Sequence, residues 1–134
     1  VDNGNVTVSF DAGELWETKA MHSDVVNPSR LIAPISGVYA ITAYVTWSAD
    51  PDGTRTLELL SSMLNPLFPT AAETMVPISG ADTKQSIATQ MCLNAAQYAT
   101  VRASVAGAGN PLTLDSALGS SRATMSLVTP VTSC

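Results

Sequence analysis

Hydrophobic and polar residues alternate with a period of two along most of this chain. The alternation begins in Asn5–Phe10 and returns in three later segments, Lys84–Asn94, Gln97–Val105 and Arg122–Pro130. Because successive side chains of a β-strand point to opposite faces, this period is typical of strands with one buried and one exposed face. Helical periodicity is almost absent, so the pattern predicts an all-β protein.

The longest apolar run, Ser36–Trp47, differs from the other segments because neither of its two faces carries a charge. A strand of this kind is normally covered on both faces. We expect one face to meet a sandwich core and the other to meet neighbouring subunits; burial entirely within one monomer is the alternative. Before it, Pro28 and Pro34 lack the N–H that a sheet uses, so Asn27–Ser36 favours a turn or an edge. Gly37 permits a close backbone approach at the strand entrance.

Two further segments predict turns. Ala49–Thr54 contains a proline and the pair Asp52-Gly53, which suit the dihedral angles of a tight turn. We therefore expect Thr54–Leu60 to return as the hairpin partner of the long strand. Leu64–Gly80 is rich in proline and predicts a loop with one or two short strands.

These segments amount to about eight to ten short strands, which predict a β-sandwich or barrel. The 134 residues fit one domain that spans 1–134, which is long enough to bury a hydrophobic core without support from disulfides or bound metals. Residues 1–5 and 130–134 are expected to be loose termini. No run of about 18 apolar residues occurs, so we expect no membrane insertion.

Charge is scarce in this chain. Asp, Glu, Lys and Arg make up 13% of the residues, against about 25% in an ordinary soluble domain. The net charge is −5, and no run of basic residues exists to neutralise phosphates, so we expect no nucleic-acid partner. A surface so poor in charge favours burial between subunits over a solitary monomer.

The two cysteines define no disulfide framework. Cys92 lies in an alternating segment, and Cys134 is the last residue. A disulfide would require their Cα atoms to lie within about 7 Å. We expect instead a buried Cys92 and a loose, free Cys134. Metal binding by this pair is less favoured still, because no histidine lies near either residue.

Several motifs resemble C1q/TNF-like jelly-roll domains. The segment "LIAPISGVYAIT", Leu31–Thr42, is similar to the family pattern of a Pro-and-Gly corner followed by Gly-x-Tyr at a strand entrance. "LNAAQYATVRASV" and "SSRATMSLV" stand where the family has its two late strands, although Ala96-Gln97 replaces the usual Gly-Asp and Met125 the usual Phe. The resemblance extends from Phe10 to Val128 and is greatest to the bacterial and phage members of the family. The conserved sequence pattern of those members is matched here by Trp16-Glu17-Thr18, Met21-His22, Asn27–Leu31, Ala33-Pro34, Gly37, Tyr39, Trp47 and Gly53-Thr54-Arg55.

The resemblance implies a two-sheet jelly roll of about ten strands that forms a homotrimer. Such domains cap stalks or fibres, bind other macromolecules or glycans, and are rarely enzymes, so we expect an extracellular, cell-surface or virion-associated protein such as a phage tail component. The same strands supply the residues expected at the trimer interface or in the core: Tyr39, Ile41, Tyr44, Trp47, Tyr98 and Met125.

Candidate catalytic and metal residues are few. His22 with Asp24 suggests a hydrolase base, but no Gly-x-Ser-x-Gly elbow exists, and a surface loop explains the pair better. Asp50 and Asp52 flank a proline and could supply oxygens to Ca²⁺, which some family members bind, although a plain turn is the commoner outcome. We therefore predict no catalytic site and no required cofactor, and keep Ca²⁺ as a possibility.

Arginines and tryptophans provide the candidate ligand-binding residues. Arg30 and Arg55 could grip a carboxylate or sulfate, although pairing with Asp24, Asp50 or Glu58 to fix loops is favoured. Trp16, beside charges, is the better candidate for an exposed aromatic that stacks on a sugar, whereas Trp47 ends an apolar strand and suits a core or interface.

The preferred hypothesis is a non-enzymatic trimeric head that assembles and presents a recognition surface to a glycan or a surface protein. A monomeric carbohydrate-binding β-sandwich module is the alternative, and a small hydrolase is the third hypothesis.

Overall fold

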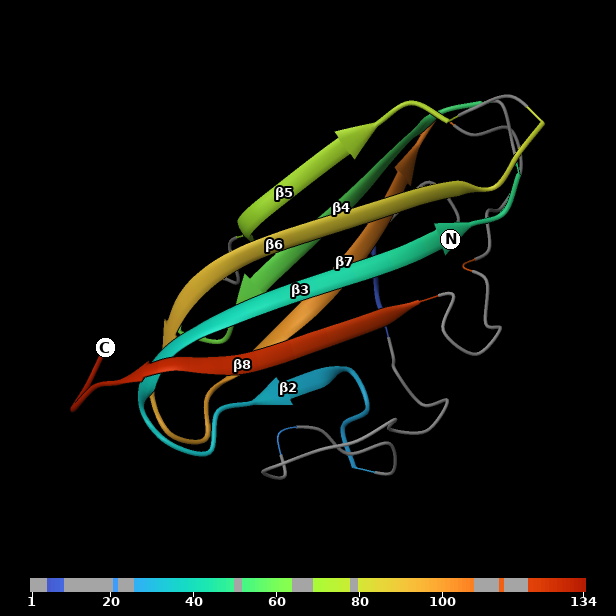
Figure 1. The fold of residues 1–134 in the computed structure, drawn as a ribbon. Coiled ribbons are helices and arrows are strands. Elements are labelled where there is room, and N and C mark those ends of the chain that lie inside the picture. Colours follow the sequence, from blue (N-terminus) through green and yellow to red (C-terminus); the bar gives the residue numbers. More distant parts are fainter. Residues whose placement is uncertain are drawn as a thin grey trace.

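A computed structural model describes residues 5–8, 21, 26–49, 52–63, 69–77, 80–107, 114 and 121–134. These residues form eight strands and no helix, arranged as two antiparallel sheets packed face to face. Figure 1 shows the two layers crossing at an angle. The predicted all-β, two-sheet jelly-roll architecture is confirmed, with eight strands in the described residues where about ten were expected for the chain.

The larger sheet has five strands in the order β1-β7-β4-β5, with β2 also paired to β7. Its strands are β1 (Asn5–Thr7), β2 (Arg30–Ile32), β4 (Thr54–Ser61), β5 (Pro69–Met75) and β7 (Tyr98–Ala106).

The smaller sheet has three strands in the order β6-β3-β8. Its central strand, β3 (Gly37–Trp47), lies between β6 (Thr83–Leu93) and β8 (Arg122–Pro130). The pairing with β6 is continuous over all eleven residues of β3, whereas the pairing with β8 shifts register between Val38 and Tyr39. A bulge of this kind bends the strand and increases its twist.

The core lies between the inner faces of the two sheets. Its side chains come from alternate positions of the strands, as the period of two predicts. From the smaller sheet they include Tyr39, Ile41, Ala43, Val45, Trp47, Ile87, Met91 and Leu93; from the larger one, Leu31, Leu57, Leu59, Ala99, Val101, Ala103 and Val105.

The predicted hairpin between β3 and β4 is wrong. β3 pairs only with β6 and β8 among the described strands, whereas β4 pairs with β5 and β7 in the opposite sheet. The turn before Thr54 therefore carries the chain from one sheet to the other, and Gly53 provides its positive φ of 78°. An alternating pattern says which face of a strand is buried, but not which strand lies beside it.

The expected loose C-terminal end and free Cys134 are also wrong. Pro130 is the last residue of β8, the Val131 N–H donates to the Ser36 carbonyl at 3.1 Å, and the Cys134 N–H donates to Asn94 Oδ1 at 2.8 Å. Cys92 and Cys134 form a disulfide with Cα atoms 5.7 Å apart. The C-terminus is thus fixed to the end of β6. Residues 1–4 lie outside the described residues.

The expected close approach at Gly37 is confirmed. A Cβ atom built at Gly37 would collide with the Leu127 side chain and lie 2.9 Å from the Thr129 carbonyl oxygen. Both residues belong to β8, so a glycine at this point allows β8 to lie against β3 where the register shifts.

The turn between β6 and β7 contains a strained residue. Ala96 has a φ of 68°, a conformation in which the Cβ of a non-glycine residue is crowded. The turn is closed by the Gln97 N–H, which donates to the Asn94 carbonyl at 3.0 Å. Backbone hydrogen bonds of 2.8 Å then join Ala33 to Ala96 and Gln97, so the turn is tied to the chain between β2 and β3.

Within the described residues, no helix is long and apolar enough to cross a membrane.

Candidate functional site

The outward side of the three-stranded sheet is the main candidate for a functional surface. Its side chains come from even-numbered positions, because the odd-numbered ones of β3 fill the core. We call this surface the β3 face and define it as Val38, Ala40, Thr42 and Tyr44 of β3, Lys84, Ser86, Ala88, Gln90 and Cys92 of β6, and Arg122, Thr124 and Ser126 of β8.

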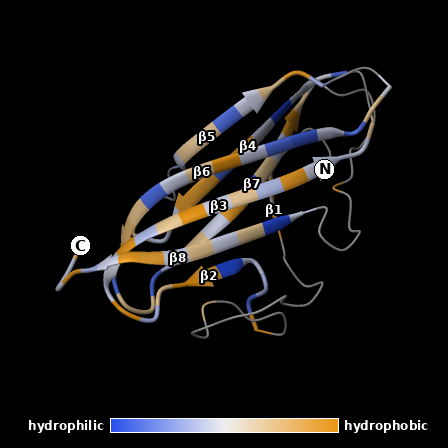
Figure 2. Cartoon of the chain, in the orientation of Figure 1, coloured by the Kyte–Doolittle hydropathy of each residue, from blue (hydrophilic) through white to orange (hydrophobic). Residues whose placement is uncertain are grey.

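Small, uncharged side chains dominate the β3 face. Thr42 at its centre is exposed, and so are its two cross-strand neighbours, Ala88 and Thr124. The hydroxyls of Thr42 and Thr124 share a hydrogen bond of 2.5 Å. Figure 2 shows β3 running through this sheet without a strongly hydrophilic segment. We expected both sides of β3 to be covered. Within the described part of this chain, the core covers one side of β3, and the other side has no such cover.

A shallow hollow of about 540 Å³ lies at one end of the β3 face. Its floor includes Ala43 and Ile87, which belong to the core, and its rim is made of Thr42, Tyr44, Ser86, Ala88 and Arg122. The Arg122 guanidinium lies over the Tyr44 ring, with its carbon 5.5 Å from the ring centre. The rim therefore combines one cation, one aromatic ring and three hydroxyl groups.

The only charged members of the β3 face are Lys84 and Arg122, and both are positive. Both are exposed, and neither forms an ion pair with any residue that the structure describes. The cationic character of this face contrasts with the net charge of −5 of the whole chain.

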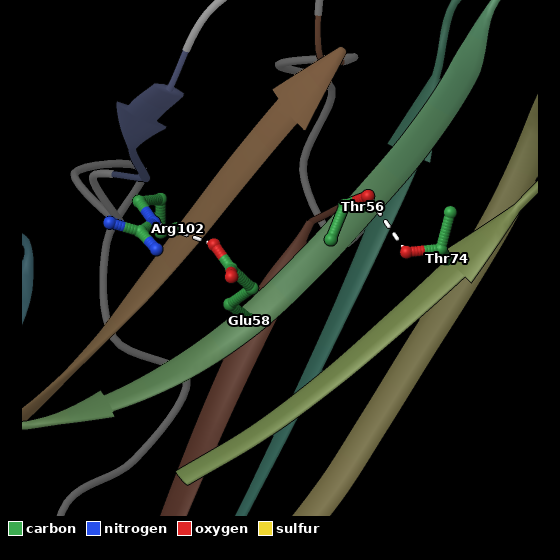
Figure 3. Close-up of polar contacts among 4 residues, drawn as sticks. All are labelled: Thr56, Glu58, Thr74 and Arg102. Atoms are coloured by element: carbon green, nitrogen blue, oxygen red, sulfur yellow. Dashed lines mark hydrogen bonds and ion pairs between the residues drawn. The ribbon is translucent and has the colours of Figure 1, made fainter. Parts of the chain in front are cut away.

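The outward side of the five-stranded sheet differs from the β3 face in carrying an ion pair beside its threonine pair. The Arg102 Nε–H donates to Glu58 Oε2 at 2.6 Å, and the Thr56 and Thr74 hydroxyls share a hydrogen bond of 2.9 Å, as Figure 3 shows. The hydrogen bond with Glu58 raises the pKa of Arg102 above its ordinary value. Each charge of this pair thus has its counter-charge within the chain.

The structure separates the six residues expected at the interface or in the core. Tyr39, Ile41 and Trp47 are fully buried in the core, and Met125 packs against it from β8. Tyr44 belongs to the β3 face. Tyr98 lies on the outward side of the other sheet. Tyr44 and Tyr98 therefore lie on opposite outer surfaces and cannot share one flat interface.

The two candidate ligand-binding arginines have different surroundings. Arg30 lies over the Tyr98 ring, with its guanidinium carbon 4.2 Å from the ring centre, so it is half-buried on the outward side of β2. Arg55 is fully buried, and its Nη1 donates to the Asp52 carbonyl at 3.3 Å. Arg55 therefore cannot bind a ligand at the surface, and that candidate role is wrong. Of the three acidic partners expected for the two arginines, Glu58 binds Arg102, and Asp24 and Asp50 lie outside the described residues.

Several other candidates lie outside the described residues: Trp16, His22, Asp24 and Asp50. Asp52, the second residue of the possible Ca²⁺ pair, is exposed. Across the described part of the chain, no three His, Cys, Asp or Glu side chains gather into a group that could hold a metal ion.

The sequence reasoning missed a buried glutamine that joins the two sheets. Gln85 of β6 is 2% exposed; its Oε1 accepts a hydrogen bond from Trp47 Nε1 at 3.1 Å, and its Nε2 donates to the Glu73 carbonyl of β5 at 2.8 Å. A signal was present, because Gln85 is in phase with Ile87 and Met91, whose side chains face the core.

Comparison with known proteins supports the fold and goes no further. No protein-family model matches the chain, and no curated protein sequence matches it. Among solved structures, the chain is similar to a structure of Eiger TNF from S. frugiperda, with 14% sequence identity and a TM-score of 0.53. The match covers 98% of this chain and 89% of the other. At this identity the likeness concerns the arrangement of the strands.

Proposed function

We propose that this domain is a non-enzymatic assembly and recognition module that forms a homotrimer through its β3 face. The observation that carries the proposal is the contrast between the two outer surfaces. On the outward side of the five-stranded sheet, Arg102 and Glu58 pair with each other, whereas Lys84 and Arg122 of the β3 face have no counter-charge in the described residues and lie among uncharged side chains around a hollow. The TNF-like fold is compatible with this role.

The composition of the β3 face suits burial against another protein. Alanine side chains are covered at little cost, and a hydroxyl is covered at modest cost where it keeps a hydrogen bond, as Thr42 and Thr124 do with each other, whereas each uncompensated charge would cost far more. Small side chains also allow two sheets to approach closely. Tyr44, half-buried at the rim of the hollow, is of the residue type that interfaces favour, because its ring is apolar and its hydroxyl binds water or a partner.

The recognition part of the proposal concerns the surfaces that a trimer leaves exposed. On the outward side of the five-stranded sheet, Arg30 stacked on Tyr98 provides a cation and an aromatic edge for a glycan or a surface protein. The Cys92–Cys134 disulfide supports an extracellular, cell-surface or virion setting, because disulfides persist in oxidising compartments.

Two matched variants test the proposed interface. Ala88→Arg introduces a long charged side chain at an exposed position of the β3 face beside Thr42. Ala72→Arg introduces the same change at an exposed position of β5 in the other sheet. Light scattering after size exclusion is expected to show a trimer for the wild-type chain and for Ala72→Arg, and a monomer for Ala88→Arg. An Ala88→Arg protein that keeps the wild-type assembly would contradict the proposed interface.

A further inference from the structure

We propose that the hollow on the β3 face is a seat for a carboxylate group that a second copy of the chain supplies. This inference rests on the proposed trimer and deepens it, because it names the group that one copy inserts into the next. It starts from the rim of the hollow, where Arg122 is the only charged side chain among the described residues and where Thr42, Tyr44 and Ser86 each carry a hydroxyl.

The chemistry of the rim favours an anion with two oxygens. A guanidinium has five N–H donors in a fixed fork, which matches the two oxygens of a carboxylate. In the described residues, Arg122 is positioned by the ring of Tyr44 beneath it, and this contact leaves its N–H donors available. The neighbouring hydroxyls can donate to the same oxygens. Of the described residues that line the hollow, none is acidic and could compete for Arg122.

Assembly through the β3 face makes a counter-charge necessary. Covering Arg122 with an uncharged surface would remove its hydration without compensation, which is strongly unfavourable. In a ring of three copies, each contact joins two different patches of the surface, so the hollow of one copy can meet an acidic group of the next. The excess of acidic over basic residues, eleven against six, makes a carboxylate the available partner.

The described residues point to one edge of the sandwich as the source of this carboxylate. Glu73 of β5 and Asp82, just before β6, are both exposed and form no ion pair with a described residue. β5 and β6 contact each other across the two sheets, and the hydrogen bond from Gln85 to the Glu73 carbonyl holds this edge together. In Figure 1 β5 and β6, each an end strand of its sheet, lie toward the same side of the sandwich. The edge formed by β5 and β6 therefore carries acidic side chains, whereas the charged side chains of the β3 face are basic.

Association measurements on the full chain test the seat. Arg122→Gln is expected to weaken trimer association at least tenfold and to make it less sensitive to salt, because the removed ion pair is screened by salt. The matched control is Arg30→Gln, which removes the other cation that lies over a tyrosine ring, on the opposite outer surface. This control is expected to form the trimer as strongly as the wild-type chain does, because the stack of Arg30 on Tyr98, proposed above to contact a ligand, lies outside the proposed trimer interface.

The source of the carboxylate is tested by combining variants. Glu73→Gln with Asp82→Asn is expected to weaken association about as much as Arg122→Gln does, and all three changes together are expected to cause little further loss. Association of Arg122→Gln at wild-type strength and with wild-type salt dependence, in a chain that is otherwise trimeric, would overturn the seat and leave the trimer standing. If Arg122→Gln weakens association but Glu73→Gln with Asp82→Asn does not, the edge formed by β5 and β6 of the second copy is not the source of the carboxylate. A monomeric wild-type chain would overturn both the seat and the trimer.

Discussion

The indole Nε1 of Trp47 donates a hydrogen bond to Oε1 of Gln85 at 3.1 Å, and both side chains are buried between the sheets. The amide nitrogen of the same glutamine donates to the Glu73 carbonyl at 2.8 Å. Gln85 therefore satisfies a buried donor in its own sheet and an acceptor in the opposite one. A polar group in a core is tolerated when each of its atoms has a partner in this way.

Replacing Gln85 with leucine should destabilise the fold by roughly 2–4 kcal/mol, because the Trp47 N–H and the Glu73 carbonyl would both lose their partner. Urea unfolding followed by tryptophan fluorescence measures the change. Thr70→Leu is the control, since Thr70 is exposed on β5 and lies outside the β3 face; its effect should stay within about 0.5 kcal/mol. Equal effects of the two variants would contradict the bridging role of Gln85.

Ala96→Gly should stabilise the protein. Ala96 has a φ of 68°, and a left-handed conformation costs a non-glycine residue about 1–2 kcal/mol. Glycine removes that strain, although its greater freedom in the unfolded chain costs about 0.5–1 kcal/mol. A net gain of roughly 0.5–1 kcal/mol is expected from the difference between these effects. Ala95→Gly, at the preceding turn position with no positive φ, should instead lower stability; a loss for both variants would show that Ala96 is not strained.

Removing the disulfide should destabilise the domain through its unfolded state. Cys92 and Cys134 are 42 residues apart in the sequence, and cross-linking a loop of this length typically contributes about 2–4 kcal/mol. The double variant Cys92→Ser with Cys134→Ser should therefore melt at a lower temperature than the oxidised wild-type chain. Wild-type protein treated with a reductant should show the same lowering, and the double variant should not respond to the reductant. An unchanged melting temperature in both cases would contradict a closed disulfide.

The positions of the strands could be predicted from the sequence, because the alternation of polar and apolar residues directly reflects the pleat of a strand. Lys84–Asn94 and Arg122–Pro130 agree closely with β6 and β8. The partners of the strands could not be predicted in the same way. Thr54–Leu60 has the same alternation whether it pairs with β3 or crosses to the other sheet, and it crosses.

The candidate site could be predicted only in part, because its contacts also depend on which strands are neighbours. The absence of charge on both sides of β3 singled out this strand, and one of its sides faces the core. On the other side, Thr42 is exposed and Val38, Ala40 and Tyr44 are half-buried within one chain, and its cover by neighbouring subunits stays a prediction. The contacts that distinguish the two outer surfaces come from residues far apart in sequence, such as Glu58 with Arg102 and Tyr44 with Arg122. These pairs depend on which strands are neighbours, so they emerge only with the sheet order.

The measurement that tests the proposed trimer most directly is the mass of the untagged wild-type chain in solution, by size exclusion with multi-angle light scattering at micromolar concentration. A single species with three times the 13.9-kDa mass of one chain is expected. A species of 13.9 kDa that persists throughout the micromolar range would contradict assembly through the β3 face.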